Sequence, residues 1–153
     1  MPDLFNARPW LLTAAGDAPR DLDACARLEE WVSALGARPR RMSAEEHDRV
    51  MAALSHLPQV VASSLMQVVG EAAGAESLAL AGRGLRDTTR LASSPGDVWS
   101  DVWTTNHDML VPLIDGVIAQ LRALRDDPTG DALRKLFIAA QGWRAALDAS
   151  DTR

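Results

Sequence analysis

Hydrophobic residues in the first part of the chain follow two patterns. A short apolar run after a proline, within Arg8–Thr13, is typical of a buried strand. Apolar residues then recur at helical spacing over Arg20–Leu35, and Gly36 stands where a helix C-cap glycine belongs. Arg38–Met42 is a second candidate strand. The pattern predicts one strand–helix–strand crossover of a parallel sheet, a unit that normally needs further layers to cover its strands.

From Ser43 onward the pattern is helical. Ser43 and Glu46 have the spacing of a capping box, which begins a helix expected to run to about His56. Pro58 is expected to separate this helix from an apolar helix over residues 59–74, because proline lacks the amide hydrogen that a helix interior needs.

Two further helices are predicted in the second half. The first covers about Asp97–Arg125 with a wide apolar stripe, and Pro112 is expected to kink it or to limit its regular hydrogen bonding. The turn Asp126–Gly130 ends it. The apolar residues of the final helix include Leu133, Leu136, Phe137, Ala140 and Leu147. The predicted fold class is therefore mainly α: a helical domain over residues 43–150, preceded over residues 1–42 by a β-α-β remnant of a Rossmann-like α/β domain.

Composition narrows the class of protein. The 153 residues are 47% hydrophobic and 24% charged, which suits one globular domain. A net charge of −5 argues against nucleic acid as a partner, because phosphate binding needs clustered positive charge. No apolar run approaches the ~20 residues of a membrane span, and no secretory signal is visible. Cys25 is the single cysteine and is predicted to lie in the core, so a reducing compartment, the cytoplasm, is expected.

Residues 81–99 contain the most distinctive candidate chemistry. A glycine-broken loop begins a short helix that carries Arg83, Arg86 and Arg90. Arg86 and Arg90 have i, i+4 spacing, so both guanidinium groups lie on one helix face and repel each other. Because the planar guanidinium suits carboxylate and phosphate, this spacing favours a small anionic ligand. The alternative is a helix-surface network in which Arg90 pairs with Asp87 or Asp101.

Motif residues recur in a fixed order along the chain. They are His47-Asp48, Ser55-His56-Leu57-Pro58-Gln59, Gly82-Arg83-Gly84-Leu85-Arg86-Asp87-Thr88-Thr89-Arg90-Leu91-Ala92, Ser94, Trp99, Asp101 and Asn106. This order resembles the helical dimerisation and substrate domain of prephenate dehydrogenases, and the similarity runs from about Leu4 to about residue 147. The resemblance implies the C-terminal portion of such an enzyme.

The resemblance also implies roles for individual residues. Arg90 would bind the ring carboxylate of the substrate, and Trp99 would lie beside the active site. Gln59 stands where the family usually has a second histidine implicated in tyrosine recognition. Glutamine cannot gain a proton near pH 6.5, so this departure puts tyrosine feedback in question. The remaining motif residues are expected to support the site: His47, Asp48, Ser55, His56, Gly82, Gly84, Arg86, Asp87 and Asn106.

Family members oxidatively decarboxylate prephenate to 4-hydroxyphenylpyruvate with NAD or NADP, in tyrosine biosynthesis. Their cofactor loop and catalytic histidine lie in an N-terminal Rossmann domain. Gly82-Arg83-Gly84 is not such a loop, because Asp87 stands where the third glycine belongs and no strand is expected before it. No catalytic, cofactor-binding or metal-binding residue is therefore expected here, and the chain alone is predicted to be inactive.

The expected partners follow from the resemblance. They are prephenate or arogenate, a second copy of the chain bound through the helical domain, and a separate Rossmann domain as a further candidate. One alternative is a stand-alone, non-catalytic helical module for dimerisation or anion binding. A second alternative is a metal phosphohydrolase of the HD type, with His47, His107-Asp108 and Asp115 in the required order. A metal site needs three or four converging ligands, which the sequence alone does not show.

Overall fold

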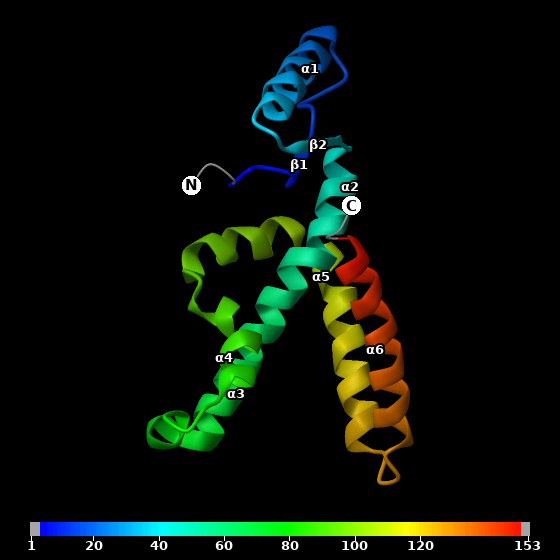
Figure 1. Cartoon of the computed structure of the whole chain (residues 1–153). Coiled ribbons are helices and arrows are strands. Elements are labelled where there is room, and N and C mark those ends of the chain that lie inside the picture. Colours follow the sequence, from blue (N-terminus) through cyan, green and yellow to red (C-terminus); the bar gives the residue numbers. More distant parts are fainter. Residues whose placement is uncertain (1–3, 151–153) are drawn as a thin grey trace. The chain divides into compact units, whose positions relative to one another are not determined.

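The computed structural model describes residues 4–150, which are mainly helical (Figure 1). The chain divides into two compact units, one up to Leu110 and one from Val111. The predicted boundary between residues 42 and 43 is a different division of the chain and stays a prediction. Within residues 4–150, no helix is both long and apolar enough to cross a membrane.

The first unit begins with the predicted crossover. Strand β1 (Pro9–Leu12) pairs in parallel with β2 (Arg38–Arg41), in a register that places Pro9 opposite Arg38. Helix α1 (Pro19–Ala34) connects the two strands and packs on them (Figure 1). Gly36 adopts a positive φ of 83° just after the helix, as a C-cap glycine does. The strand–helix–strand prediction is confirmed.

The core of this crossover is small. Its buried apolar residues are Leu12, Cys25, Val32 and Ala37. The prediction that Cys25 lies in the core is confirmed, because its side chain is buried and unpaired to another sulfur. Large apolar side chains on the outer side of α1, such as Trp31, remain exposed.

The chain then runs as one helical stretch from α2 into α3. Helix α2 (Ala44–Met51) begins as predicted, since the Ser43 hydroxyl accepts a hydrogen bond from the Glu46 amide at 3.0 Å. A π-helical segment, η1 (Ala52–His56), leads directly into α3 (Leu57–Leu78).

The prediction that Pro58 separates two helices is wrong. Pro58 lies in the first turn of α3. The preceding turn is widened: the Leu57 amide bonds to the Ala52 carbonyl, five residues back. This π-type spacing accommodates the missing amide hydrogen and the ring of the proline, which would clash with the preceding turn of a regular α-helix.

Helix α3 leaves helical geometry at Gly74, where the predicted apolar helix ends. The Gly74 dihedrals are φ 72° and ψ 162°. The chain then turns back through α4 (Arg83–Thr88) and the 3₁₀ segment η2 (Arg90–Ser93), and η2 packs against α3 (Figure 1).

Helix α5 (Gly96–Arg125) breaks at Asn106 (φ −125°, ψ 21°). The kink expected at Pro112 is therefore misplaced, and Pro112 lies inside the helix beyond the break. The second part of α5 and α6 (Asp131–Ser150) form the second unit, an antiparallel hairpin (Figure 1). In its turn, the Asp127 carboxylate accepts hydrogen bonds from Thr129 and Ala132, which lower its pKa to about 2.

We expect Gly74→Ala to destabilise the fold by about 1–3 kcal/mol, because the dihedrals of Gly74 lie in a region that side chains with a Cβ avoid. Gly70→Ala is the matched control. Neither glycine has an atom within 4 Å of the position of an added Cβ, and Gly70 lies in regular helix. Urea unfolding of both variants measures the difference. Equal stability of the two variants would contradict the assigned turn.

Candidate functional site

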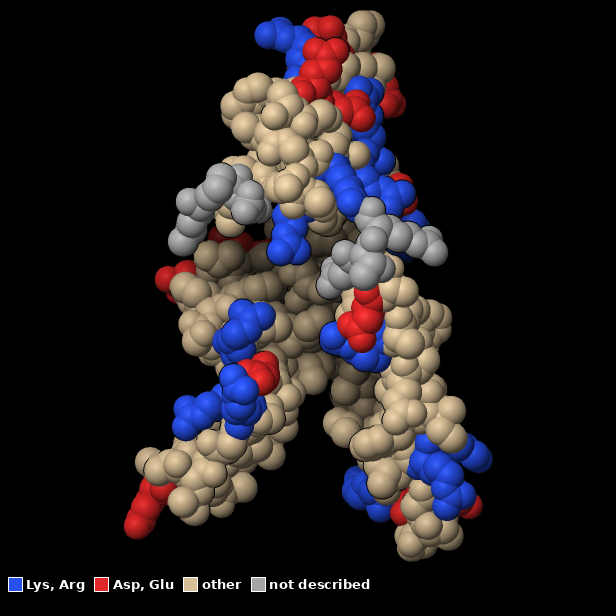
Figure 2. Space-filling model, in the orientation of Figure 1, with Lys and Arg blue, Asp and Glu red and all other residues tan. Residues whose placement is uncertain are grey.

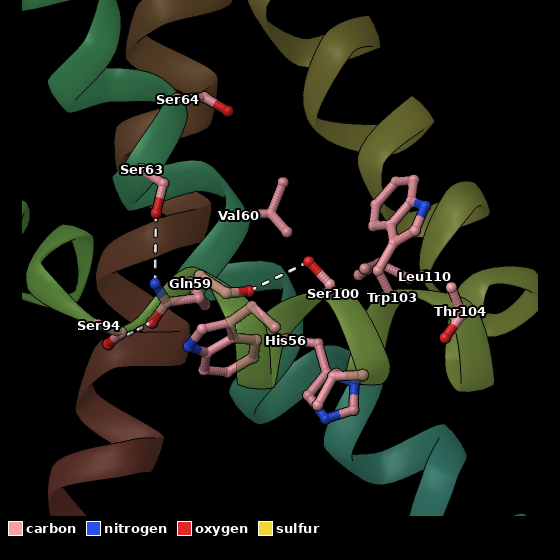
Figure 3. Close-up of a pocket in the computed structure, with 13 residues that line it drawn as sticks. His56, Gln59, Val60, Ser63, Ser64, Ser94, Ser100, Trp103, Thr104 and Leu110 are labelled. Carbon is pink, nitrogen blue, oxygen red and sulfur yellow. Dashed lines mark hydrogen bonds between the residues drawn. The ribbon is translucent and has the colours of Figure 1, made fainter.

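A cavity of about 550 Å³ opens in the first unit between α3 and the first part of α5. The helices contribute a mixture of aromatic, hydroxyl and amide side chains (Figure 3). The lining residues are His56, Gln59, Val60, Ser63, Ser64, Ser94, Gly96, Trp99, Ser100, Val102, Trp103, Thr104 and Leu110. Three residues that the sequence singled out, His56, Gln59 and Trp99, are thus brought together.

Gln59 joins α3 to the segment that carries Arg90. Its side chain is only 5% exposed and lies between Ser63 and Ser94 in Figure 3. The amide nitrogen donates to the Leu91 carbonyl at 2.8 Å and to the Ser63 hydroxyl at 3.3 Å, and the amide oxygen accepts from Ser94 at 3.3 Å. Because both ends of the amide are already bonded within the protein, Gln59 holds η2 against α3.

His56 lies at the end of the π segment, where it meets α5. Its Nδ1 is 3.1 Å from the amide nitrogen of Asn106, and that nitrogen also donates to the Asp48 backbone carbonyl at 2.8 Å. Burial lowers the pKa of His56; the carboxylate of Asp48 opposes this shift, and His47 adds to it. The neutral imidazole is therefore favoured. Asn106, expected to be a supporting residue, is 6% exposed and bridges two elements.

Two tryptophans of α5 give the cavity an aromatic wall. The Trp99 ring meets His56 edge to face, with ring centroids 6.0 Å apart. Trp103 follows one turn later on the same helix and also lines the cavity. Trp103 and Ser63 are not among the residues predicted for the site, although their i, i+4 spacing from Trp99 and from Gln59 is a signal in the sequence that could have identified them. An apolar wall with a few polar groups suits a small ring-shaped ligand that carries oxygen atoms.

The three arginines lie outside this cavity. Arg83, Arg86 and Arg90 are exposed on α4 and η2, where Figure 2 shows basic side chains gathered. The Arg86 Nε donates to the Ala81 carbonyl at 3.3 Å. Across residues 4–150, none of the three has a carboxylate at ion-pair distance, so the surface network of Arg90 with Asp87 or Asp101 is absent. Arg90 nevertheless precedes Leu91, whose carbonyl Gln59 binds.

The other motif residues do not line the cavity. Ser55 lies in the π segment, and Asp87 is exposed. A Cβ added at Gly82 or Gly84 would meet no atom within 4 Å, so the chain itself does not require glycine there. His47 pairs with its neighbour Asp48, with Nδ1 3.0 Å from a carboxylate oxygen.

The structure gives no support to the metal phosphohydrolase hypothesis. In the part of the chain that the structure describes, no group of three or more His, Cys, Asp or Glu side chains could hold a metal ion. The histidines of the proposed set pair with their own neighbours instead, His47 with Asp48 and His107 with Asp108.

The fold and the cavity together define a class of protein. It is a helical domain that follows a strand–helix–strand unit and contains a cavity lined by aromatic and amide side chains. The family model for the prephenate dehydrogenase dimerization domain matches residues 43–137. The chain belongs to the prephenate dehydrogenase family. The recognition made from the motif residues is confirmed.

Curated relatives agree with this assignment. The chain is 35% identical over 154 residues to the cyclohexadienyl dehydrogenase of Zymomonas mobilis, covering 95% of this chain and 51% of the relative. It is 30% identical over 149 residues to the prephenate dehydrogenase of Bacillus subtilis, covering 94% of this chain and 40% of the relative. The chain thus spans about half the length, or less, of these relatives.

Solved structures share the fold. The arogenate dehydrogenase of Synechocystis superposes with a TM-score of 0.75 at 25% identity, covering 95% of this chain and 54% of that one. The prephenate dehydrogenase of Aquifex aeolicus, in complex with hydroxyphenyl propionate and NAD⁺, superposes with a TM-score of 0.73 at 24% identity, covering 100% of this chain and 53% of that one.

We expect Gln59→Met to lower the free energy of unfolding by about 1–3 kcal/mol, because it leaves the Leu91 carbonyl without its donor. Gln67→Met is the matched control: Gln67 bonds Glu71 on the exposed surface of the same helix, and its replacement should cost no more than about 0.5 kcal/mol. Urea unfolding measures both values. If the two substitutions cost the same, Gln59 does not hold η2.

Proposed function

We propose that this chain supplies the helical, substrate-binding and dimerising part of a prephenate dehydrogenase. The observation that carries the proposal is the match of residues 43–137 to the family model, joined to a cavity of suitable chemistry in the matched region. The reaction would be the oxidative decarboxylation of prephenate, or of arogenate, in tyrosine biosynthesis. Because the chain spans about half of its relatives, the activity would belong to this part together with a nucleotide-binding domain.

Arg90 and Trp99 are the proposed substrate-binding residues. Prephenate and arogenate both carry a ring carboxylate, and a guanidinium binds a carboxylate through two charge-assisted hydrogen bonds. The absence of an ion-pair partner for Arg90 among residues 4–150 supports this role. Trp99 would pack against the substrate from the cavity wall. Gln59, whose amide is bonded internally, would act by holding the Arg90 segment in place.

The described residues do not fit a nicotinamide dinucleotide. A pyrophosphate site needs free backbone amides at a helix N-terminus after a glycine-rich turn. After β1, however, helix α1 begins with a proline and carries Asp21 in its first turn, where a phosphate would be repelled. Helix α4 begins at Arg83 after a turn rather than a strand. NAD or NADP would therefore be held by another domain; the Aquifex aeolicus relative is in complex with NAD⁺.

The second unit is suited to a homodimer interface. None of its described residues is buried, and large apolar side chains face outward on both helices. Trp143 is 80% exposed, and Leu121, Phe137 and Ile138 are also exposed. A hairpin of this composition gains stability when a second copy covers it.

The cytoplasm is the proposed compartment, in keeping with the unpaired Cys25.

We expect the chain to produce NADH or NADPH from prephenate only when it is assembled with the part of the Zymomonas mobilis relative that it does not cover. In that assembly, Arg90→Ala should weaken prephenate affinity by about 10- to 150-fold, the effect of losing a charge-assisted pair. Cofactor absorbance reports turnover, and its dependence on prephenate concentration reports affinity.

Arg83→Ala is the matched control, because it removes the same charge from the same surface patch. An equal loss in both variants would show that the patch attracts anions only through its overall charge. Prephenate binding without turnover in any assembly would favour the stand-alone module. Failure to bind prephenate or arogenate at all would refute the proposed function.

A further inference from the structure

The geometry points to Asn106 as a positioning residue that fixes His56 as a neutral hydrogen-bond donor, with the proton on Nε2, at the wall of the cavity. The class of ligand inferred for His56 rests on the proposed function. The tautomer of His56 rests only on contacts within this chain.

The orientation of the Asn106 amide follows from the Asp48 backbone carbonyl. A carbonyl oxygen can only accept, so the Asn106 atom that lies 2.8 Å from it must be the amide nitrogen and not the amide oxygen. The same nitrogen lies 3.1 Å from Nδ1 of His56. Its two hydrogens are thus used, one on each partner.

The tautomer of His56 follows in turn. Because a donor faces Nδ1, that nitrogen must accept, and the single proton of the neutral ring lies on Nε2. A proton added to Nδ1 would place two donors against each other. The charged or titratable groups that face the ring are Asp48 and His47 of α2, whereas α5 contributes the neutral Trp99 and Asn106.

The Nε2–H group remains available for a ligand. Within residues 4–150 it has no hydrogen-bond partner, and no buried side-chain nitrogen or oxygen lacks one, so Nε2 is accessible rather than enclosed. His56 also lines the cavity. A fixed Nε2–H donor recognises an acceptor oxygen. If the proposed function holds, this is a carboxylate, carbonyl or hydroxyl oxygen of prephenate.

The experiment is a long-range ¹H–¹⁵N correlation spectrum of the chain, which distinguishes the two ring nitrogens of each of its 3 histidines. The expected spectrum shows His56 with the proton on Nε2. His47 is the internal reference for the other tautomer, because its Nδ1 faces the Asp48 carboxylate. His56 with its proton on Nδ1, or as an even mixture, would overturn the proposal.

Substitution at Asn106 separates positioning from a merely structural role. Asn106→Asp puts an acceptor against Nδ1, so the His56 proton should move to Nδ1 or the ring should become protonated. Asn106→Ala, which removes the amide without adding charge, should give a mixture of tautomers if the aspartate variant does not fold. An unchanged His56 signal in a folded variant would overturn the positioning role.

Prephenate tests the donor itself in the assembled enzyme. Its addition should shift the Nε2 signal of His56, and His56→Phe should lower affinity about 3- to 10-fold, whereas His107→Phe, outside the cavity lining, should not. Binding without a shift at Nε2 would overturn the donor role. If prephenate fails to bind at all, the proposed function fails while the spectrum of the free chain still decides the tautomer.

Discussion

The first unit depends on the hydrogen bonds of one buried amide. Asn106 stands where α5 breaks, and its side chain reaches the Asp48 carbonyl of α2 and the ring of His56. A buried amide left without these partners costs about 1–3 kcal/mol, so the break and the two bonds stabilise each other. The break sets the direction of the preceding turns of α5, which carry Trp99 and Trp103 to the cavity. The hydrogen bonds of Asn106 thus help to place the aromatic wall formed by Trp99 and Trp103.

Gln59 completes the site in the same way from α3. Its amide binds the Leu91 carbonyl and so fixes the 3₁₀ segment that begins at Arg90. Two amides, at 5% and 6% exposure, therefore connect segments that lie far apart in the sequence. Buried apolar residues are few across the described chain, and many large ones are exposed. The hydrogen bonds of these two amides specify the local geometry. The exposed apolar surface is suited to association with another protein chain or domain.

Much of this architecture could be predicted from the sequence because local signals determine it. The parallel crossover, the Ser43 cap and the end of the apolar helix at Gly74 each rest on a few neighbouring residues. The break at Asn106 was missed because it depends on one partner in α2 and one in the π segment η1, 58 and 50 residues away in sequence. Pro58 was misjudged because a π turn, which composition does not reveal, accommodates it. The motif singled out His56, Gln59 and Trp99, which line one cavity, but it did not predict that the Gln59 amide would be bonded internally.

We propose that prephenate occupies the cavity walled by His56 and Trp99, with Arg90, which lies outside the cavity lining, binding its ring carboxylate. The most direct test is a backbone and side-chain NMR titration of the assembled protein with prephenate. We predict shifts at the indole of Trp99, the ring of His56 and the guanidinium of Arg90, and none along the exposed face of α6. Shifts confined to the arginines, with the cavity residues unchanged, would contradict the binding of prephenate in this cavity.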